Sequence, residues 1–397
     1  MRPFSRRRNL LYSLTMDRVH SLNFQRIEWC CEQAGITPEH LASDVGIAVD
    51  TLRKAREGID ALTPGQLRKI ATYFGRGILF FLEPSPAEQV KIYTPQFRTL
   101  TNQKPRLSTK LKQIIQRAER QRAVYLSLLE DLDDEDRPQF SPPRFRGGDP
   151  KEAATAAQKW LGIEKQRSFD EYRASVEARG LLVFRSNGYN GKWQIPKDNS
   201  ILGFSIYDTT CPLIVVKKQT PETRQTFTLM HELGHILLHK TSSIDDESDL
   251  YSRQGLEREA NVFAGFLLVS DKRLATVRDT ERPSEVSQYD EWLEPQRMAW
   301  GVSGEVILRR LLDAGRLSEA LYRAYRQWRA ASIRYQEESG NRMYRHREPK
   351  HIFGDRFVRT VLDALNAKQI TLARASDYLD SLKITDLHQL AKHYADH

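Results

Sequence analysis

The residues of this sequence best placed to do chemistry lie in the motif HELGH at positions 231–235. On a helix, His231 and His235 stand one turn apart on the same face, so both imidazoles can reach one metal ion. Glu232 points toward the same cavity and can take a proton from a metal-bound water. Zinc suits imidazole and carboxylate ligands that leave a fourth position open for water. The motif therefore predicts a zinc site with Glu232 as the catalytic base.

A third protein ligand is expected on a second helix, which carries the run EREAN and lies 22 residues beyond His235. A loop of that length can fold this helix back so that Glu257 reaches the ion. Asn261, four residues further on, shares the face of Glu257 and is expected to hydrogen-bond a ligand and hold its orientation. Glu259 is the alternative ligand, but it lies on a different face from Asn261. We favour Glu257.

His239 is a second alternative ligand. It stands two helical turns beyond His231, about 12 Å along the axis, so the three histidines of this helix cannot all bind one ion. We favour the interpretation that His239 is a polar residue at the helix end, where it complements the helix dipole.

The elements that must position these residues form a mixed pattern. Short apolar runs at 181–185, 201–208 and 212–218 predict strands. The second and third resemble a hairpin whose outer edge is expected to hold an extended substrate, although ordinary sheet core is an equally good interpretation for any one residue there. Helices are predicted over 222–240 and 256–270, joined by a polar loop.

The N-terminal part of the chain predicts a compact helical unit. Between residues 24 and 81, Thr-Pro pairs begin two short helices and glycines end others, which is typical of a helix-turn-helix domain. Possible DNA contacts are Arg53, Lys54 and Arg56. However, eight basic residues face nine acids between residues 9 and 83, so we expect weak DNA binding with little sequence preference, and protein docking is an equal alternative.

Late in the chain, ten Lys and Arg residues face four acids between residues 323 and 359. Tyrosines and a tryptophan alternate with these arginines, as in Tyr322, Tyr325 and Trp328. Such a stretch can stack on nucleic acid. We favour a helix with an aromatic core face and a solvated basic face.

The fold class predicted is mainly α with a small β-sheet. An all-helical helix-turn-helix domain precedes an α+β zincin-like peptidase domain and a helical C-terminal region. The expected divisions are a basic arm (1–22), the helix-turn-helix domain (23–83), a connector with a basic helix (84–149), the zinc metallopeptidase domain (150–315) and the C-terminal region (316–397).

Composition excludes several classes of protein. The chain has 397 residues, a net charge of +9, 40% hydrophobic residues and three cysteines. Two adjacent cysteines and one distant one cannot form a disulfide framework, and no apolar run reaches the roughly 18 residues of a membrane helix. We expect a soluble, cytoplasmic protein without a membrane partner.

The motifs together resemble the ImmA/IrrE family of zinc metallopeptidases. The resemblance is carried by three runs that follow one another, TFTLMHELGHILLHK, EREANVFAGFLLVS and WGVSGEVILRRL. The N-terminal unit is similar to the Cro/repressor-type (XRE-like) helix-turn-helix domain that members often carry. The resemblance implies a gluzincin-like zinc site made by His231, His235 and Glu257, with Glu232 as base. It also implies a regulatory role in stress response or mobile elements.

Two functional hypotheses follow. The first is a zinc-dependent regulatory endopeptidase that cleaves a repressor or antitoxin-like protein to change gene expression. The alternative is a DNA-binding regulator or antitoxin-like repressor whose metal site is structural or weakly active.

Overall fold

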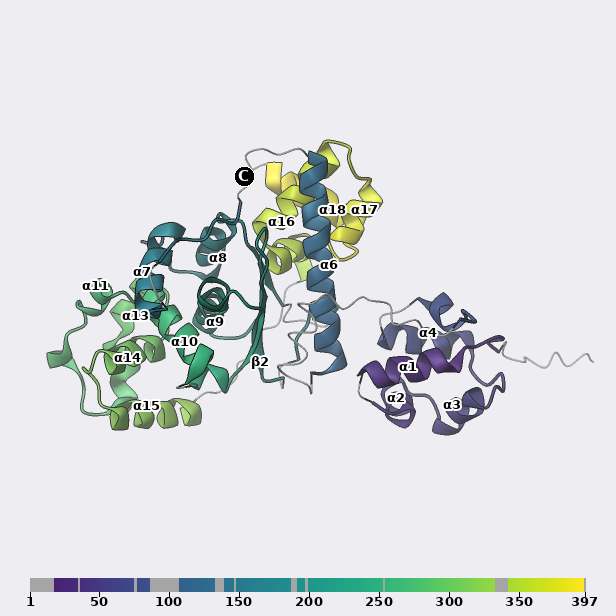
Figure 1. The fold of residues 1–397 in the computed structure, drawn as a ribbon, viewed down its shortest axis with the longest axis horizontal. Coiled ribbons are helices and arrows are strands. Elements are labelled where there is room, and N and C mark those ends of the chain that lie inside the picture. The colour runs from purple at the N-terminus through teal and green to yellow at the C-terminus, as the bar shows by residue number, and fades with distance from the viewer. Residues whose placement is uncertain are drawn as a thin grey trace, which may run out of the picture. The chain divides into compact units, whose positions relative to one another are not determined.

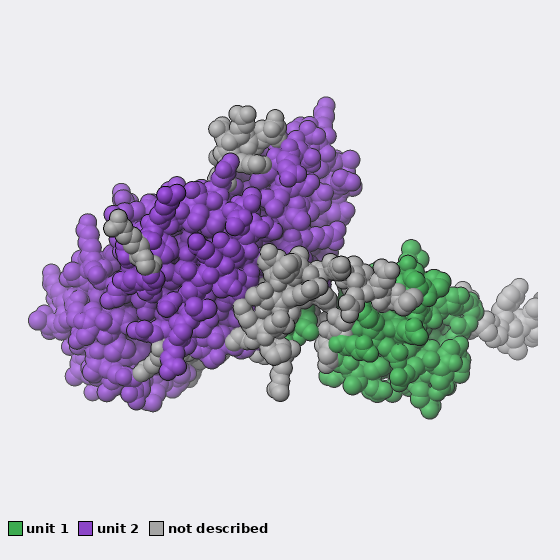
Figure 2. Space-filling view, viewed as in Figure 1, with its two compact units in different colours: residues 1–93, 107–113 green, residues 94–106, 114–397 purple. Residues whose placement is uncertain are grey.

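The computed structural model describes residues 18–34, 36–74, 77–85, 107–132, 139–145, 148–186, 191–196, 199–252, 254–332 and 342–395. The chain divides into two compact units (Figure 2). Unit 1 comprises residues 1–93 and 107–113, and unit 2 comprises residues 94–106 and 114–397. The predicted basic arm lies outside the described residues as far as residue 17, as does the connector over 86–106 and 133–138.

Unit 1 consists of short helices around a core of its own. Its elements are α1 (Phe24–Ala34), α2 (Pro38–Val45), α3 (Val49–Arg56), α4 (Pro64–Tyr73) and the 3-10 turn η1 (Ile78–Phe81). The two predicted Thr-Pro starts are confirmed, because the Thr37 hydroxyl accepts from the His40 amide and Thr63 forms a reciprocal capping box with Gln66. Leu41 and Leu67 are fully buried in the core. The assignment of α2 and α3 as a helix-turn-helix motif stays a prediction.

Unit 2 is built on a four-stranded mixed sheet. Its strands are β1 (Leu182–Arg185), β2 (Ile201–Ile206), β3 (Leu213–Val216) and β4 (Ser243–Asp246), in the order β1-β3-β2-β4. β1 and β3 run parallel, whereas β2 is antiparallel to both β3 and β4. The three predicted strands and the predicted hairpin are thus confirmed, but β4 lies in the stretch that the sequence presented as a polar loop.

The predicted free edge of the hairpin is wrong. β2 has β4 on its outer side and β3 has β1, so the edges of the sheet are β1 and β4. An edge that pairs an extended peptide must therefore be sought on one of these two strands.

Helices surround this sheet. They are α6 (Thr109–Leu132), α7 (Pro150–Leu161), α8 (Phe169–Glu177), α9 (Glu222–Gly234), α10 (Gly255–Leu268), α11 (Asp271–Leu274), α12 (Tyr289–Trp292), α13 (Glu294–Trp300), α14 (Gly304–Asp313), α15 (Glu319–Ser332), α16 (Glu348–Asn366), α17 (Leu372–Tyr378) and α18 (Ile384–Ala395). Between them lie the π turn η2 (His235–His239) and the 3-10 turns η3 (Asp249–Tyr251), η4 (Asp279–Glu281), η5 (Val286–Gln288) and η6 (Arg342–Arg347). The described residues beyond 270 carry helices and turns without strands, as predicted.

The two faces of the sheet are covered by different helices. α9 packs on β2 and β3, and α10 packs on α9 and α7, while α16 lies on the other side of the sheet (Figure 1). Alternation along β1 shows why, since Val183 joins the core that includes α9, whereas Phe184 contacts Phe353 and Phe357 of α16. No helix among the described residues has the length and apolar character needed to cross a bilayer.

Helix α15 has an aromatic core face, as favoured above. Tyr322 and Tyr325 are buried, and the Tyr325 hydroxyl donates to Asp290 at 2.9 Å. On the same helix Arg326 pairs with Glu305 and Arg329 pairs with Asp290. The tyrosines therefore serve packing within unit 2.

A buried arginine joins α8 to the C-terminal helices. Arg173 is 3% exposed and its Nε donates to Glu177, itself 4% exposed, at 3.1 Å. Its two Nη atoms donate to the carbonyls of His351 and Ile352 at 3.0 Å, directly before Gly354 kinks α16 at φ +82°. One guanidinium thus neutralises a buried carboxylate and satisfies carbonyls at the kink.

Replacing Arg173 with Met is expected to lower the free energy of unfolding by about 3–5 kcal/mol, because Glu177 is left buried without its cation. The matched control is Arg323→Met. Arg323 pairs with Glu319 at 3.2 Å on an exposed face of α15, and its loss is expected to cost no more than about 1 kcal/mol. Chemical denaturation of the full chain measures both. Equal losses would show that the Arg173 pair does not hold the C-terminal helices.

Candidate metal centre

Two histidines of α9 and η2 begin the site. His231 and His235 are 0% and 1% exposed, and their Nε2 atoms lie 3.2 Å apart. The helix is buried on all sides from Gln225 to Gly234, because the sheet covers one side and α10 the other. The predicted pair thus lies on one face and points to one place.

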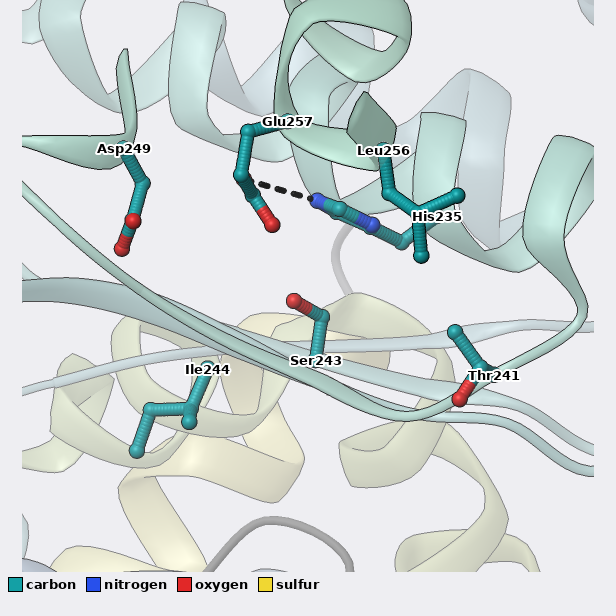
Figure 3. A pocket seen from close by; sticks show the side chains of 7 residues that line it. All are labelled: His235, Thr241, Ser243, Ile244, Asp249, Leu256 and Glu257. Carbon is teal, nitrogen blue, oxygen red and sulfur yellow. Dashed lines mark ion pairs between the residues drawn. The ribbon is translucent and has the colours of Figure 1, made fainter. Parts of the chain in front are cut away.

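Glu257 reaches this place from α10. Its Oε2 lies 3.3 Å from the Nε2 of His231 and 3.4 Å from the Nε2 of His235, and Figure 3 shows it pointing at His235. Gly234 makes this approach possible, because a Cβ there would lie 3.2 Å from the Cα of Ala260. The glycine of HELGH therefore lets α10 cross α9 closely and brings Glu257 to the histidines.

A fourth side chain, which the sequence analysis missed, completes the cluster. Asp245 on β4 is 1% exposed, and its Oδ2 lies 3.3 Å from the Nε2 of His231 and 3.6 Å from the Nε2 of His235. Its Oδ1 accepts a hydrogen bond from the Ser243 hydroxyl at 2.8 Å. The four ligand atoms of His231, His235, Asp245 and Glu257 lie within 4.8 Å of one another.

These residues fit a divalent metal ion. The Oδ2 of Asp245 is buried and has no hydrogen-bond partner among the described residues, although it is aimed at the two imidazoles. Asp245 and Glu257 bring two carboxylates to the same pair of imidazoles, and neighbouring carboxylates repel one another unless a cation compensates them. Imidazole and carboxylate are ligands that zinc prefers, so the donor set suits the predicted ion.

Glu232 lies beside the cluster. It is fully buried, and among the described residues neither of its carboxylate oxygens has a hydrogen-bond partner. Burial and the negative charge of the neighbouring Asp245 raise the pKa of Glu232 well above the ordinary value. The nearby Ser205 opposes this shift without cancelling it. A Cβ at Gly203 of β2 would lie 2.9 Å from the Oε1 of Glu232, so this glycine gives the carboxylate its room.

His239 and Glu259 form a chain of polar contacts that ends at His235. The Nδ1 atoms of His235 and His239 lie 3.0 Å apart, and the Nε2 of His239 pairs with the Oε2 of Glu259 at 3.0 Å. His239 follows His235 by four residues within the π turn η2, so the two side chains are neighbours on one face. His239 is thus the last residue of the helix and lies outside the cluster, as favoured, and it also links His235 to Glu259. Glu259 contacts His239 and is not a member of the cluster.

Asn261 has a different partner from the one expected. Its side-chain amide donates to the backbone carbonyl of Asp249 at 2.9 Å, and its Oδ1 has no partner among the described residues. Asn261 therefore holds the η3 turn next to α10. Its amide faces η3 and makes no hydrogen bond to the four residues of the cluster.

A pocket of about 330 Å³ opens beside His235 and Glu257 (Figure 3). Its wall includes Ser243 and Ile244 of β4, and its other lining residues are Thr241, Asp249 and Leu256. The candidate metal centre therefore borders a space in which a peptide backbone can lie against the edge strand.

A comparison with family models finds one match within unit 2. Residues 193–312 match Peptidase_M78, the IrrE N-terminal-like domain. The match supports the ImmA/IrrE resemblance and a metallopeptidase domain, and the matched residues include Glu232 and all four members of the cluster. No curated protein matches the chain significantly.

The possible DNA contacts of unit 1 are all in ion pairs. Arg53 and Lys54 both pair with Asp50, at 2.5 and 2.8 Å, and Arg56 pairs with Glu28 at 2.7 Å. The three side chains remain half or more exposed. Each side chain must break its ion pair before it can contact a DNA phosphate. Weak DNA binding by these residues therefore stays a prediction.

The third-ligand assignment predicts unequal effects of two neighbouring substitutions. Glu257→Gln is expected to lower zinc affinity by more than about 100-fold, whereas Glu259→Gln acts only through His239 and is expected to cost about tenfold. Competition with a chromophoric chelator measures both. Equal losses, or a larger loss for Glu259→Gln, would contradict the placement of Glu257 at the ion.

Zinc affinity is also expected to depend on pH. Burial alone would lower the pKa of His231, but Asp245 and Glu257 outweigh it and raise that pKa from 6.5 to about 9. Since the imidazole must lose its proton to bind zinc, affinity should rise by up to about tenfold per pH unit until pH 9. Titration against a chelator between pH 6 and 9 tests this, and a constant affinity above pH 6.5 would contradict it.

Proposed function

We propose that this protein is a zinc-dependent regulatory endopeptidase of the ImmA/IrrE type. The observation that carries the proposal is the position of Glu232, a buried carboxylate next to a cluster of two imidazoles and two carboxylates. A metal site with a free carboxylate at its side is the arrangement that hydrolysis by activated water requires.

The chemistry divides between the ion and the chain. When bound, zinc polarises a carbonyl and makes water more acidic. The chain's own part is to hold and move a proton, because a Glu232 oxygen accepts the proton of the attacking water and returns it to the nitrogen of the leaving amine. The raised pKa of Glu232 suits this shuttle, since a more basic carboxylate accepts a proton more readily.

An extended peptide is the substrate class that the site supports. β4 is an edge strand and forms one wall of the pocket beside Glu257. A peptide that pairs with this edge would lie with its backbone across the metal centre, and main-chain hydrogen bonds would supply much of its affinity. β4 therefore replaces the hairpin as the proposed substrate edge.

The regulatory part of the proposal comes from the family resemblance. It implies that the substrate is a repressor or antitoxin-like protein, cut in the cytoplasm to change gene expression, and that unit 1 acts as a helix-turn-helix domain. The ion pairs of Arg53, Lys54 and Arg56 favour protein docking by this unit over tight DNA binding.

One observation favours the alternative function. Four protein ligands are typical of structural zinc sites, which are closed to water. The alternative is thus a DNA-binding regulator in which the metal only stabilises unit 2. The two functions differ in the effect of removing the base, because a structural site does not need Glu232.

Glu232→Gln is expected to retain zinc and to lose cleavage of a candidate repressor or antitoxin-like protein by about 100-fold or more, since the proton acceptor is gone and the ligands remain. Electrophoresis of the substrate measures cleavage, and elemental analysis measures zinc. Wild-type protein treated with a chelator is the second inactive control. Undiminished cleavage by Glu232→Gln would refute the proposed role.

A further inference from the structure

Five of the six separations between the ligand atoms of the metal centre are close to those of a tetrahedral site. These five are 3.2, 3.3, 3.3, 3.4 and 3.6 Å, and all six are within 4.8 Å. For zinc bonds of about 2.0–2.1 Å, the edge of a regular tetrahedron is about 3.3–3.4 Å. Asp245 and Glu257 therefore each lie at tetrahedral distances from the two imidazoles, and their two carboxylate oxygens lie no more than 4.8 Å apart.

Asp245 takes the corner that a catalytic site keeps for water. Catalytic zinc sites have three protein ligands and one open position, and His231, His235 and Glu257 are the three that HELGH and the second helix supply. The fourth corner is occupied by the Oδ2 of Asp245, which also neighbours Glu232. A carboxylate there lies where the attacking water must bind.

The local structure of β4 aims Asp245 into this corner. Asp246 pairs with Ile201, but Asp245 already pairs with Gly203, so β2 has one extra residue opposite this step. Such bulges re-aim side chains and weaken pairing next to active sites. The hydroxyl of Ser243, which lines the pocket, then fixes the other carboxylate oxygen.

The charge of the centre changes with Asp245 in place. Zinc with two carboxylates and two neutral imidazoles is neutral, which suits a site whose two imidazoles and Asp245 are buried. Without Asp245 the centre carries one positive charge, and its power to polarise a carbonyl or acidify water is correspondingly greater.

From this geometry we propose that Asp245 is a fourth metal ligand that closes the site, and that hydrolysis requires Asp245 to leave the ion. The proposal rests on the proposed function for its regulatory meaning. Binding of a peptide to β4, with a contact to Ser243, would draw the carboxylate of Asp245 away from the ion. Ser243 and Asp245 lie on the same four-residue edge strand, so a change at one affects the other.

The test uses full-length protein loaded with Co²⁺ in place of zinc, with acetohydroxamate as the probe of an open position. We expect the visible spectrum of the wild-type cobalt protein to stay the same when acetohydroxamate is added. The spectrum of Asp245→Ala should change on the same addition. Zinc affinity of Asp245→Ala should fall by about tenfold or more. Asp245→Asn keeps the shape of the side chain and serves if Asp245→Ala does not fold.

Asp246→Asn is the matched control, since Asp246 lies on the same strand outside the cluster. It should behave as the wild type in both measurements. A wild-type cobalt spectrum that responds to acetohydroxamate, or unchanged zinc affinity in Asp245→Ala and Asp245→Asn, would overturn the assignment.

Peptide hydrolysis separates this proposal from the proposed function. We expect Asp245→Ala to cleave a mixture of peptides at least about tenfold faster than the wild type, and Asp245→Ala with Glu232→Gln not to cleave it. If Asp245→Ala opens the site to acetohydroxamate but cleaves nothing, Asp245 is still the closing ligand and the peptidase function is wrong. If Asp245→Ala cleaves more slowly than the wild type, Asp245 assists catalysis and the closing role is wrong.

Discussion

The structure depends on bringing a buried carboxylate, Asp245, and a half-buried one, Glu257, to within 3.3–3.6 Å of two buried imidazoles. Like charges at such distances are unfavourable unless a cation compensates them. A metal ion would take over the compensation that a protonated His231 provides in its absence, and α9, η2, α10 and β4 each contribute one side chain to the cluster. Metal binding and the packing of these elements must consequently stabilise one another.

The surrounding fold limits how these elements can move. α9 is fixed between the sheet and α10, and Gly203 and Gly234 permit close approaches that a larger side chain would prevent. β4 is held less firmly, since it is a four-residue edge strand beside a bulge. His231, His235 and Glu257 come from packed helical elements, whereas Asp245 comes from an edge strand. The site is therefore best suited to open at Asp245.

Much of the site was predictable, because helices place residues at fixed spacing. HELGH and EREAN predicted His231, Glu232, His235 and Glu257, and apolar runs predicted β1, β2 and β3. β4 and Asp245 were missed because SSIDD is mostly polar, and only its pairing with β2 makes it a strand. The alternation of Ser243, Ile244 and Asp245 was the available signal. The pairing of His239 with Glu259 depends on how α10 packs beside η2, which sequence periodicity does not show.

The most direct measurement is an anomalous difference map from crystals of the purified protein, with data collected on both sides of the zinc absorption edge. The account predicts one peak in unit 2, about 2.0–2.2 Å from the Nε2 atoms of His231 and His235 and from carboxylate oxygens of Glu257 and Asp245. A peak elsewhere, or zinc bound without Glu257, would contradict it.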